Sequence, residues 1–160
     1  MASGNNPLQV SLPSDREIVL TRMFDAPRAL VYKACTDAKH VPEWWGPKGY
    51  TTIVDKLDLR VGGVWRFIQR APNGAEFAFN GVYREIVPPE KIVFTFEFEG
   101  MPGHILVQTI RFEDKRGKTL VTSTAVFDTQ ADRDGMVNSG MEKGAADSYD
   151  RLEELLKTMA

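Results

Sequence analysis

The sequence predicts an α+β fold in which a curved antiparallel sheet of about seven strands surrounds a long C-terminal helix, with two short helices after the first strand. Residues 50–127 consist of short β-branched and aromatic runs separated by turn residues, with no helical pattern between them. Residues 130–159 then carry one amphipathic helical pattern. Before the sheet, Trp44 and Trp45 adjoin a Gly-Pro turn, as aromatics that plug a sheet or wall a cavity often do.

The composition is that of one ordinary globular domain. The chain has 160 residues, of which 42% are hydrophobic and 26% charged, with a net charge of -2. This length suits a single core, which we place at residues 14–160 after a flexible tail at residues 1–13. The charge balance predicts no nucleic-acid partner, and no segment is apolar and long enough to predict a membrane span.

The cysteine content and the N-terminus indicate a reducing compartment. Cys35 is the single cysteine, so it has no partner for a disulfide or a thiolate metal site. A secretory signal is not expected, because Gly4 to Pro7 interrupt the apolar residues at the start. We therefore expect a cytoplasmic protein, either a monomer or a homodimer. In the tail, Leu8, Val10 and Leu12 alternate and could pair transiently with a sheet edge.

The first elements follow from the next signals along the chain. Alternating apolar residues over 16–24 predict a strand. Asp25 is expected to cap the following helix, with Pro27 in its first turn. A second short helix is predicted from Asp37 to about Glu43, because Pro42 and the Gly-Pro turn oppose a longer one.

Six further strands are expected in the antiparallel meander. Their predicted ranges are 51–58, 64–70, 76–87, 91–98, 104–113 and 119–127. Asn73-Gly74 is the strongest hairpin signal. Ile92, Phe94, Phe96 and Phe98 alternate with more polar residues, which indicates one buried face and one wetter face.

The last helix is predicted from about Gln130 to Met159. Thr129 and Asp132 approximate a capping box at its start. Ser139-Gly140 is a pair that kinks or splits helices. The apolar face includes Met141, Ala145 and Tyr149 and should cover the sheet.

This order of elements is that of the helix-grip fold, and several motifs resemble one family. These are Phe24-Asp25-Ala26-Pro27, Trp44-Trp45-Gly46-Pro47, Asp58-Leu59-Arg60-Val61-Gly62-Gly63, Gly81-Val82-Tyr83-Arg84-Glu85-Ile86 and Ser139-Gly140-Met141-Glu142-Lys143-Gly144. Over roughly residues 15–158 the chain resembles homologues of the ATPase activator of the 90-kDa heat-shock protein. That family belongs to the START-like, or SRPBCC, superfamily, which includes birch-pollen-allergen-like proteins.

The resemblance implies a cavity between the sheet and the C-terminal helix. Many relatives carry a larger side chain at the position of Ala145, which implies a cavity that is wider or differently floored here. The eukaryotic activator carries a separate chaperone-contacting domain ahead of this one, and a tail of about 14 residues cannot replace it. A chaperone partner is therefore doubtful.

The function expected is binding of a small hydrophobic or aromatic molecule in this cavity, without a cofactor. Enzymatic activity is not the preferred interpretation. The side chains expected to bind the ligand are Trp44, Trp45, Trp65, Phe67, Phe79, Tyr83, Phe94, Phe96, His104, Met141, Ala145 and Tyr149.

Two other classes of function stay open. No nucleophile motif occurs, and neither His40 nor His104 has a neighbour at metal-ligand spacing, so no catalytic or metal residue is assigned. A cyclase- or hydrolase-like enzyme would need a charged residue turned inward, for which the candidates are Glu76, Glu85, Glu97, Arg66 and Arg111. A stress-associated protein-interaction module would instead show a filled cavity and an exposed apolar patch.

Overall fold

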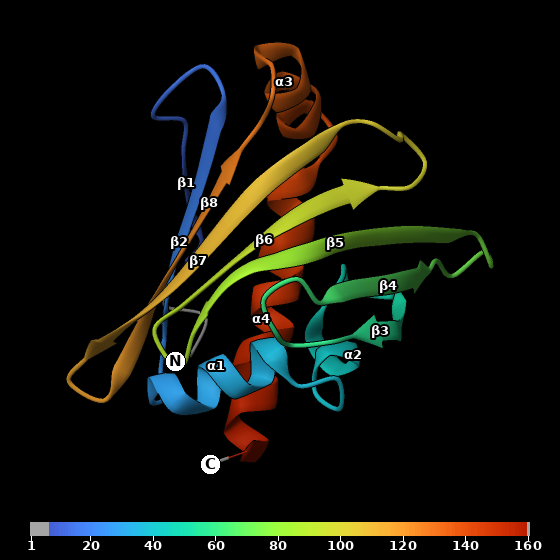
Figure 1. Cartoon of the computed structure of the whole chain (residues 1–160). Helices are drawn as coiled ribbons and strands as arrows, with labels where there is room; N and C mark the ends of the chain where they lie inside the picture. The colour runs from blue at the N-terminus through green and yellow to red at the C-terminus, as the bar shows by residue number, and fades with distance from the viewer. Residues whose placement is uncertain (1–6, 160) are drawn as a thin grey trace.

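The computed structural model describes residues 7–159 as a curved antiparallel sheet with helices on its concave side (Figure 1). The strands are β1 (Gln9–Ser11), β2 (Glu17–Phe24), β3 (Thr51–Leu57), β4 (Val64–Arg70), β5 (Glu76–Val87), β6 (Lys91–Phe98), β7 (Ile105–Lys115) and β8 (Lys118–Val126). The helices are α1 (Arg28–Thr36), α2 (Val41–Trp44), α3 (Gln130–Asn138) and α4 (Met141–Met159). The predicted α+β helix-grip architecture is confirmed.

All neighbouring strands are antiparallel, in the order β1-β2-β8-β7-β6-β5-β4-β3. The register shifts between Val54 and Lys56 in β3 and between Tyr83 and Glu85 in β5. Such bulges bend a strand and increase its twist, which helps the sheet to curve around α4. Among residues 7–159, no helix is both long and apolar enough to cross a membrane.

The sheet has eight strands where about seven were expected, because part of the expected tail forms β1. Val10 pairs with Leu20 of β2, and Leu8 and Val10 pack against the cluster that contains Ile18 and Leu20. Burial of these alternating apolar side chains stabilises the added strand. The rest of that expectation, at residues 1–6, lies outside the described part of the chain.

The C-terminal helix is divided into α3 and α4, where one helix was predicted with a possible break. Gly140 lies between them with φ +84°, a left-handed conformation that ends a helix and that glycine adopts without strain. Thr129 caps the start of α3 as predicted, because the Asp132 N–H donates to the Thr129 hydroxyl at 3.1 Å. The Asp132 carboxylate lies 2.8 Å from His104 Nδ1.

Both short helices are confirmed, with corrected starts. Pro27 itself is the extended N-cap of α1 and no side chain caps the helix, so the prediction that Asp25 is the cap was wrong. The second helix starts at Val41, not at Asp37. Asp37 instead forms a turn in which its carboxylate accepts the Lys39 N–H at 2.8 Å, and Asx turns of this kind compete with helix.

The core lies between the sheet, α1 and the C-terminal half of α4. The large side chains of α4 are buried there, with Leu152 and Leu156 at most 2% exposed. Their cluster comprises Phe24, Ala26, Val31, Tyr32, Ala34, Trp44, Ile92, Phe112, Val121, Tyr149, Leu152, Leu155 and Leu156. This close-packed half anchors α4 on the sheet.

Trp44 connects α2 to this core. Its indole N–H donates to the carbonyl of Ala34 at 2.9 Å, and its ring stacks on Tyr149 with centroids 6.4 Å apart. Trp45, its neighbour in sequence, is only partly buried and contacts Phe67 and Phe79. The two adjacent tryptophans therefore have different surroundings.

We expect Trp44→Ala to lower the free energy of unfolding by about 3–5 kcal/mol, because it removes a buried ring and leaves a cavity. Trp45→Ala is the matched control and should cost less, because one side of that ring is not packed. Urea denaturation monitored by circular dichroism measures both. Equal losses in the two variants, or no loss for Trp44→Ala, would contradict this assignment.

Candidate ligand-binding site

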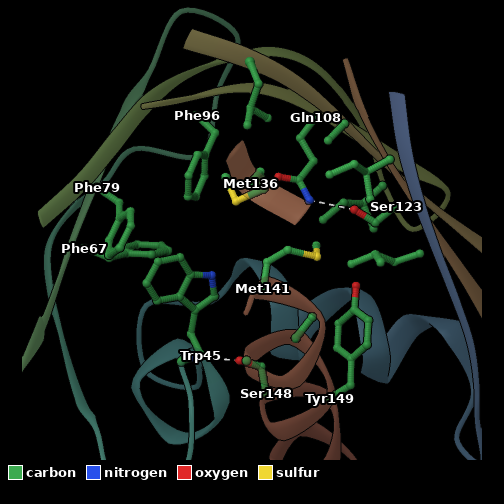
Figure 2. A pocket seen from close by; sticks show the side chains of 18 of the residues that line it. Trp45, Phe67, Phe79, Phe96, Gln108, Ser123, Met136, Met141, Ser148 and Tyr149 are labelled. Carbon is green, nitrogen blue, oxygen red and sulfur yellow. Dashed lines mark hydrogen bonds between the residues drawn. The ribbon is translucent and has the colours of Figure 1, made fainter. Parts of the chain in front are cut away.

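A cavity of about 470 Å³ lies between the concave face of the sheet and the N-terminal half of α4. This volume falls within the range of about 300–1,000 Å³ that is usual for small-molecule sites. Figure 2 shows side chains from the sheet, the α2 turn and α4 pointing into it. The cavity is thus the principal candidate for a functional site.

The cavity exists because the inward residues of α4 change in size along the helix. The C-terminal half presents leucines, whereas Gly144, Ala145 and Ser148 line the cavity in the N-terminal half. Gly144 lies so near the α2 turn that an added Cβ would stand 3.7 Å from Pro47 Cγ. These small residues leave space that the aromatic side chains of the sheet do not fill.

One wall is formed by aromatic rings in edge contact. Trp45 lies 5.1 Å from Phe67 and 5.3 Å from Phe79 between ring centroids, at nearly perpendicular angles. Phe79 lies 5.5 Å from Phe96. Such contacts are favourable, so the wall is held in place before any ligand arrives.

The turn that carries Trp45 is tied to α4 through its backbone. The N–H of Gly46 donates to the Ser148 hydroxyl at 2.9 Å, and the Arg151 guanidinium donates to the Gly46 carbonyl at 3.0 Å. Thr52 donates its hydroxyl to the Trp45 carbonyl. These bonds restrict the backbone that positions the indole.

Trp65, Tyr83 and Phe94 form the deeper wall. Trp65 packs over Gly81, where an added Cβ would stand 2.5 Å from the indole nitrogen and 1.8 Å from the Thr95 carbonyl oxygen. Glycine at this position therefore allows the Trp65 indole nitrogen and the Thr95 carbonyl to approach the backbone of β5 closely. Burial raises the pKa of Tyr83, so its hydroxyl stays protonated.

A polar corner interrupts the apolar lining at β7 and β8. The Gln108 amide Nε2 donates to Ser123 Oγ at 2.6 Å, and the Tyr149 hydroxyl points into the same corner (Figure 2). Burial raises the pKa of Tyr149, an effect opposed by the hydroxyl of Ser123. The corner therefore offers neutral hydrogen-bonding groups within an apolar cavity.

Sequence reasoning missed Gln108 and Ser123. The signal was present in the alternation of β7 and β8, where each occupies an inward position between apolar residues such as Leu106 and Ile110. A polar residue in an otherwise apolar face is more informative than another apolar one. Both side chains line the cavity.

The structure brings the other predicted binding residues together, with one exception. Cavity-lining positions are occupied by Trp44, Trp45, Trp65, Phe67, Phe79, Tyr83, Phe94, Phe96, Met141, Ala145 and Tyr149. His104 is exposed in the loop between β6 and β7 and does not line the cavity. Its Nδ1 lies 2.8 Å from an Asp132 carboxylate oxygen, which joins that loop to α3.

The candidate charged residues lie away from the cavity. The side chains of Glu76 and Glu85 pair with Arg70 and Lys91, respectively, and Glu97 accepts the Gly103 N–H. Arg111 is exposed.

Arg66 forms a two-point ion pair with Glu99, at 2.8 and 2.9 Å. Hydrogen bonds from Arg66 and Asn80 lower the pKa of Glu99 to about 2. Glu99 does not line the cavity, and within residues 7–159 no Asp, Glu, Lys, Arg or His does. No cluster of three metal-binding side chains occurs in that range either.

The cavity borders solvent at the joint between α3 and α4. Ser139 and Gly140 are the lining residues that are exposed to solvent. Met136 and Met141 flank this joint and point inward (Figure 2). Unbranched thioether side chains adapt to irregular shapes, which suits the entrance of a binding site.

Cys35 supplies a test of how dry the inner end of the cavity is. Burial raises the pKa of its thiol from 9.0 to about 12. Because only the thiolate attacks an alkylating reagent, iodoacetamide at pH 8 should react on the order of a thousandfold more slowly with folded than with urea-unfolded protein. Mass spectrometry over time measures both rates. Equal rates would show that water and reagent reach the thiol freely.

Comparison with known proteins agrees with this fold. The family model described as Activator of Hsp90 ATPase homolog 1-like protein matches residues 25–157. No curated protein matches the sequence significantly.

Several solved structures are similar over nearly the whole chain. Protein CV1439 from Chromobacterium violaceum is 27% identical, with a TM-score of 0.80, and the match covers 89% of this chain and 98% of that one. A Rhodobacter sphaeroides protein is 20% identical, with a TM-score of 0.89 and coverages of 95% and 99%. An Arthrobacter aurescens protein is also 20% identical, with a TM-score of 0.87 and coverages of 94% and 91%. The last two likenesses concern the fold alone.

Proposed function

The chain belongs to the Activator of Hsp90 ATPase homolog 1-like family, and we propose that it binds one small hydrophobic or aromatic molecule in the cavity between the sheet and α4. The observation that carries the proposal is the cavity of about 470 Å³, walled by aromatic rings and methionines. Transfer of an apolar ligand from water into such a space is favourable by about 25 cal/mol per Å² of apolar surface buried.

The fixed position of the walls also supports binding. Side chains of Ser148 and Arg151 hold the turn that carries Trp45, so little conformational entropy remains to be lost when a ligand enters. The aromatic edges around Phe67 and Phe79 favour a flat ligand. The proposal requires no cofactor.

The residue types that line the cavity favour ligand binding over catalysis. General acid-base catalysis most often uses histidine, carboxylate or lysine side chains, and the described lining has none. Tyrosine and cysteine can also transfer protons, but burial raises the pKa values of Cys35, Tyr83 and Tyr149 and keeps them protonated near neutral pH. A protein-interaction module was expected to show a filled cavity, whereas this cavity has space. The single cysteine and ordinary charge balance support our proposal that the protein acts in the cytoplasm.

Ala145→Trp tests the site directly. We expect a neutral fluorescent probe, N-phenyl-1-naphthylamine, to bind the parent protein saturably and the variant at least about tenfold more weakly, because the indole occupies the ligand's space. The free energy of unfolding should change by less than the roughly 1–3 kcal/mol that overpacking a filled core costs. Fluorescence titration and urea denaturation are measured on the same samples.

Glu142→Trp is the matched control, since Glu142 is exposed on the same helix and does not line the cavity. It should leave probe binding unchanged. A parent protein that shows no saturable binding would refute the proposed function. Lost stability with unchanged binding in Ala145→Trp would place Ala145 in packed core and would also refute it.

A further inference from the structure

The Gln108 amide nitrogen faces Ser123 in the structure. This Nε2 donates to Ser123 Oγ, which belongs to a side chain only 1% exposed on β8. With the nitrogen engaged there, the amide oxygen points into the cavity, as Figure 2 shows. Among residues 7–159, no group donates a hydrogen bond to this oxygen. This oxygen can therefore accept a hydrogen bond from a ligand in the cavity.

A second glutamine in the cavity lacks such an anchor. Gln69 lies beside the α2 turn, where an added Cβ on Gly46 would stand 2.7 Å from its Nε2. No hydrogen bond fixes its amide within the described residues. An unanchored amide can turn either its oxygen or its nitrogen to a ligand, so it discriminates less between donors and acceptors.

The charge of the lining restricts the ligand further. A buried anion or cation needs a charged or strongly hydrogen-bonding partner, and the described lining provides no charged side chain. The buried hydroxyls of Tyr83 and Tyr149 have raised pKa values and stay neutral. A ligand that carries a full charge would lose its hydration without compensation.

The aromatic wall and the Gln108 oxygen face the same space. Gln108 of β7 is paired with Phe94 of β6, and two residues along the same strands Leu106 is paired with Phe96. In Figure 2, Phe96 and Gln108 point into the cavity from adjacent strands, with Phe67 and Phe79 beyond Phe96. One molecule can therefore contact the rings with its flat part and reach the amide with a substituent.

We propose that the ligand is a neutral aromatic compound whose hydroxyl or N–H group donates a hydrogen bond to Gln108 Oε1 while its ring packs against Trp45, Phe79 and Phe96. This inference rests on the proposed function and adds the chemical class of the ligand. Gln108 is then the residue that determines specificity, and Ser123 is a positioning residue that fixes its amide.

The test compares ligands that differ in one group. The ligands are 2-naphthol, which can donate, 2-methoxynaphthalene, which cannot, and 2-naphthoate, which is charged at pH 7; each displaces N-phenyl-1-naphthylamine in a competition titration. We expect 2-naphthol to bind about tenfold more tightly than 2-methoxynaphthalene, although the ether is the more hydrophobic of the two. We expect no displacement by 2-naphthoate.

Two variants assign the preference to one amide. Gln108→Met keeps the length of the side chain but removes its acceptor, so 2-naphthol should lose its advantage. Gln69→Met is the matched control and should retain the advantage. Ser123→Ala frees the Gln108 amide to rotate and should reduce the advantage without removing binding of the methoxy compound.

The outcomes separate this inference from the proposed function. Saturable probe binding combined with equal affinity for 2-naphthol and 2-methoxynaphthalene would overturn the inference and leave the proposed function standing. Tight binding of 2-naphthoate, or a preference that disappears in Gln69→Met but not in Gln108→Met, would also overturn it. If the probe itself does not bind saturably, both fail.

Discussion

The fold depends on how α4 covers the concave face of the sheet. The C-terminal half of the helix buries Leu152, Leu155 and Leu156 in the core, which fixes the helix on the strands. The N-terminal half extends over the same curved surface with Gly144 and Ala145, which are too small to fill it. Because the packed C-terminal half holds α4 at a fixed distance from the sheet, the N-terminal half cannot move closer to the sheet and close the space. Core and cavity therefore result from one gradient of side-chain size.

The chemical character of the cavity is set by the strands that line it. The sheet supplies aromatic rings from β4, β5 and β6, while β7 and β8 contribute Gln108 and Ser123. Among residues 7–159, no charged side chain lines the cavity; Arg66 and Glu99, for example, pair with each other outside it. The cavity is therefore lined mainly by apolar side chains, with the hydrogen-bonding groups of Gln108 and Ser123 at one corner. Under the proposed function, shape and one hydrogen bond would select the ligand.

Alternation was sufficient to predict β2 to β8, and proline and turn residues predicted the two short helices. The alternation in β6 predicted that Phe94 and Phe96 share one buried face, but not that this face borders a cavity. The break at Gly140 was foreseen only as an alternative, since glycine can either kink or end a helix. His104 was misplaced because a loop residue has no periodicity to orient it. The alternation of β7 indicates the inward position of Gln108, but its hydrogen bond to Ser123 could not be predicted because the two residues become neighbours only when β7 and β8 pair.

The central claim is that the cavity beneath α4 holds a neutral aromatic ligand, and intermolecular NMR contacts test it most directly. Protein labelled at its methionine methyl groups is mixed with N-phenyl-1-naphthylamine. Met136 and Met141 line the cavity, whereas Met101 is 55% exposed in the loop between β6 and β7. We expect nuclear Overhauser effects from the naphthyl protons to the methyl groups of Met136 and Met141 and none to Met101. Contacts to Met101 alone, or to no methionine, would contradict it.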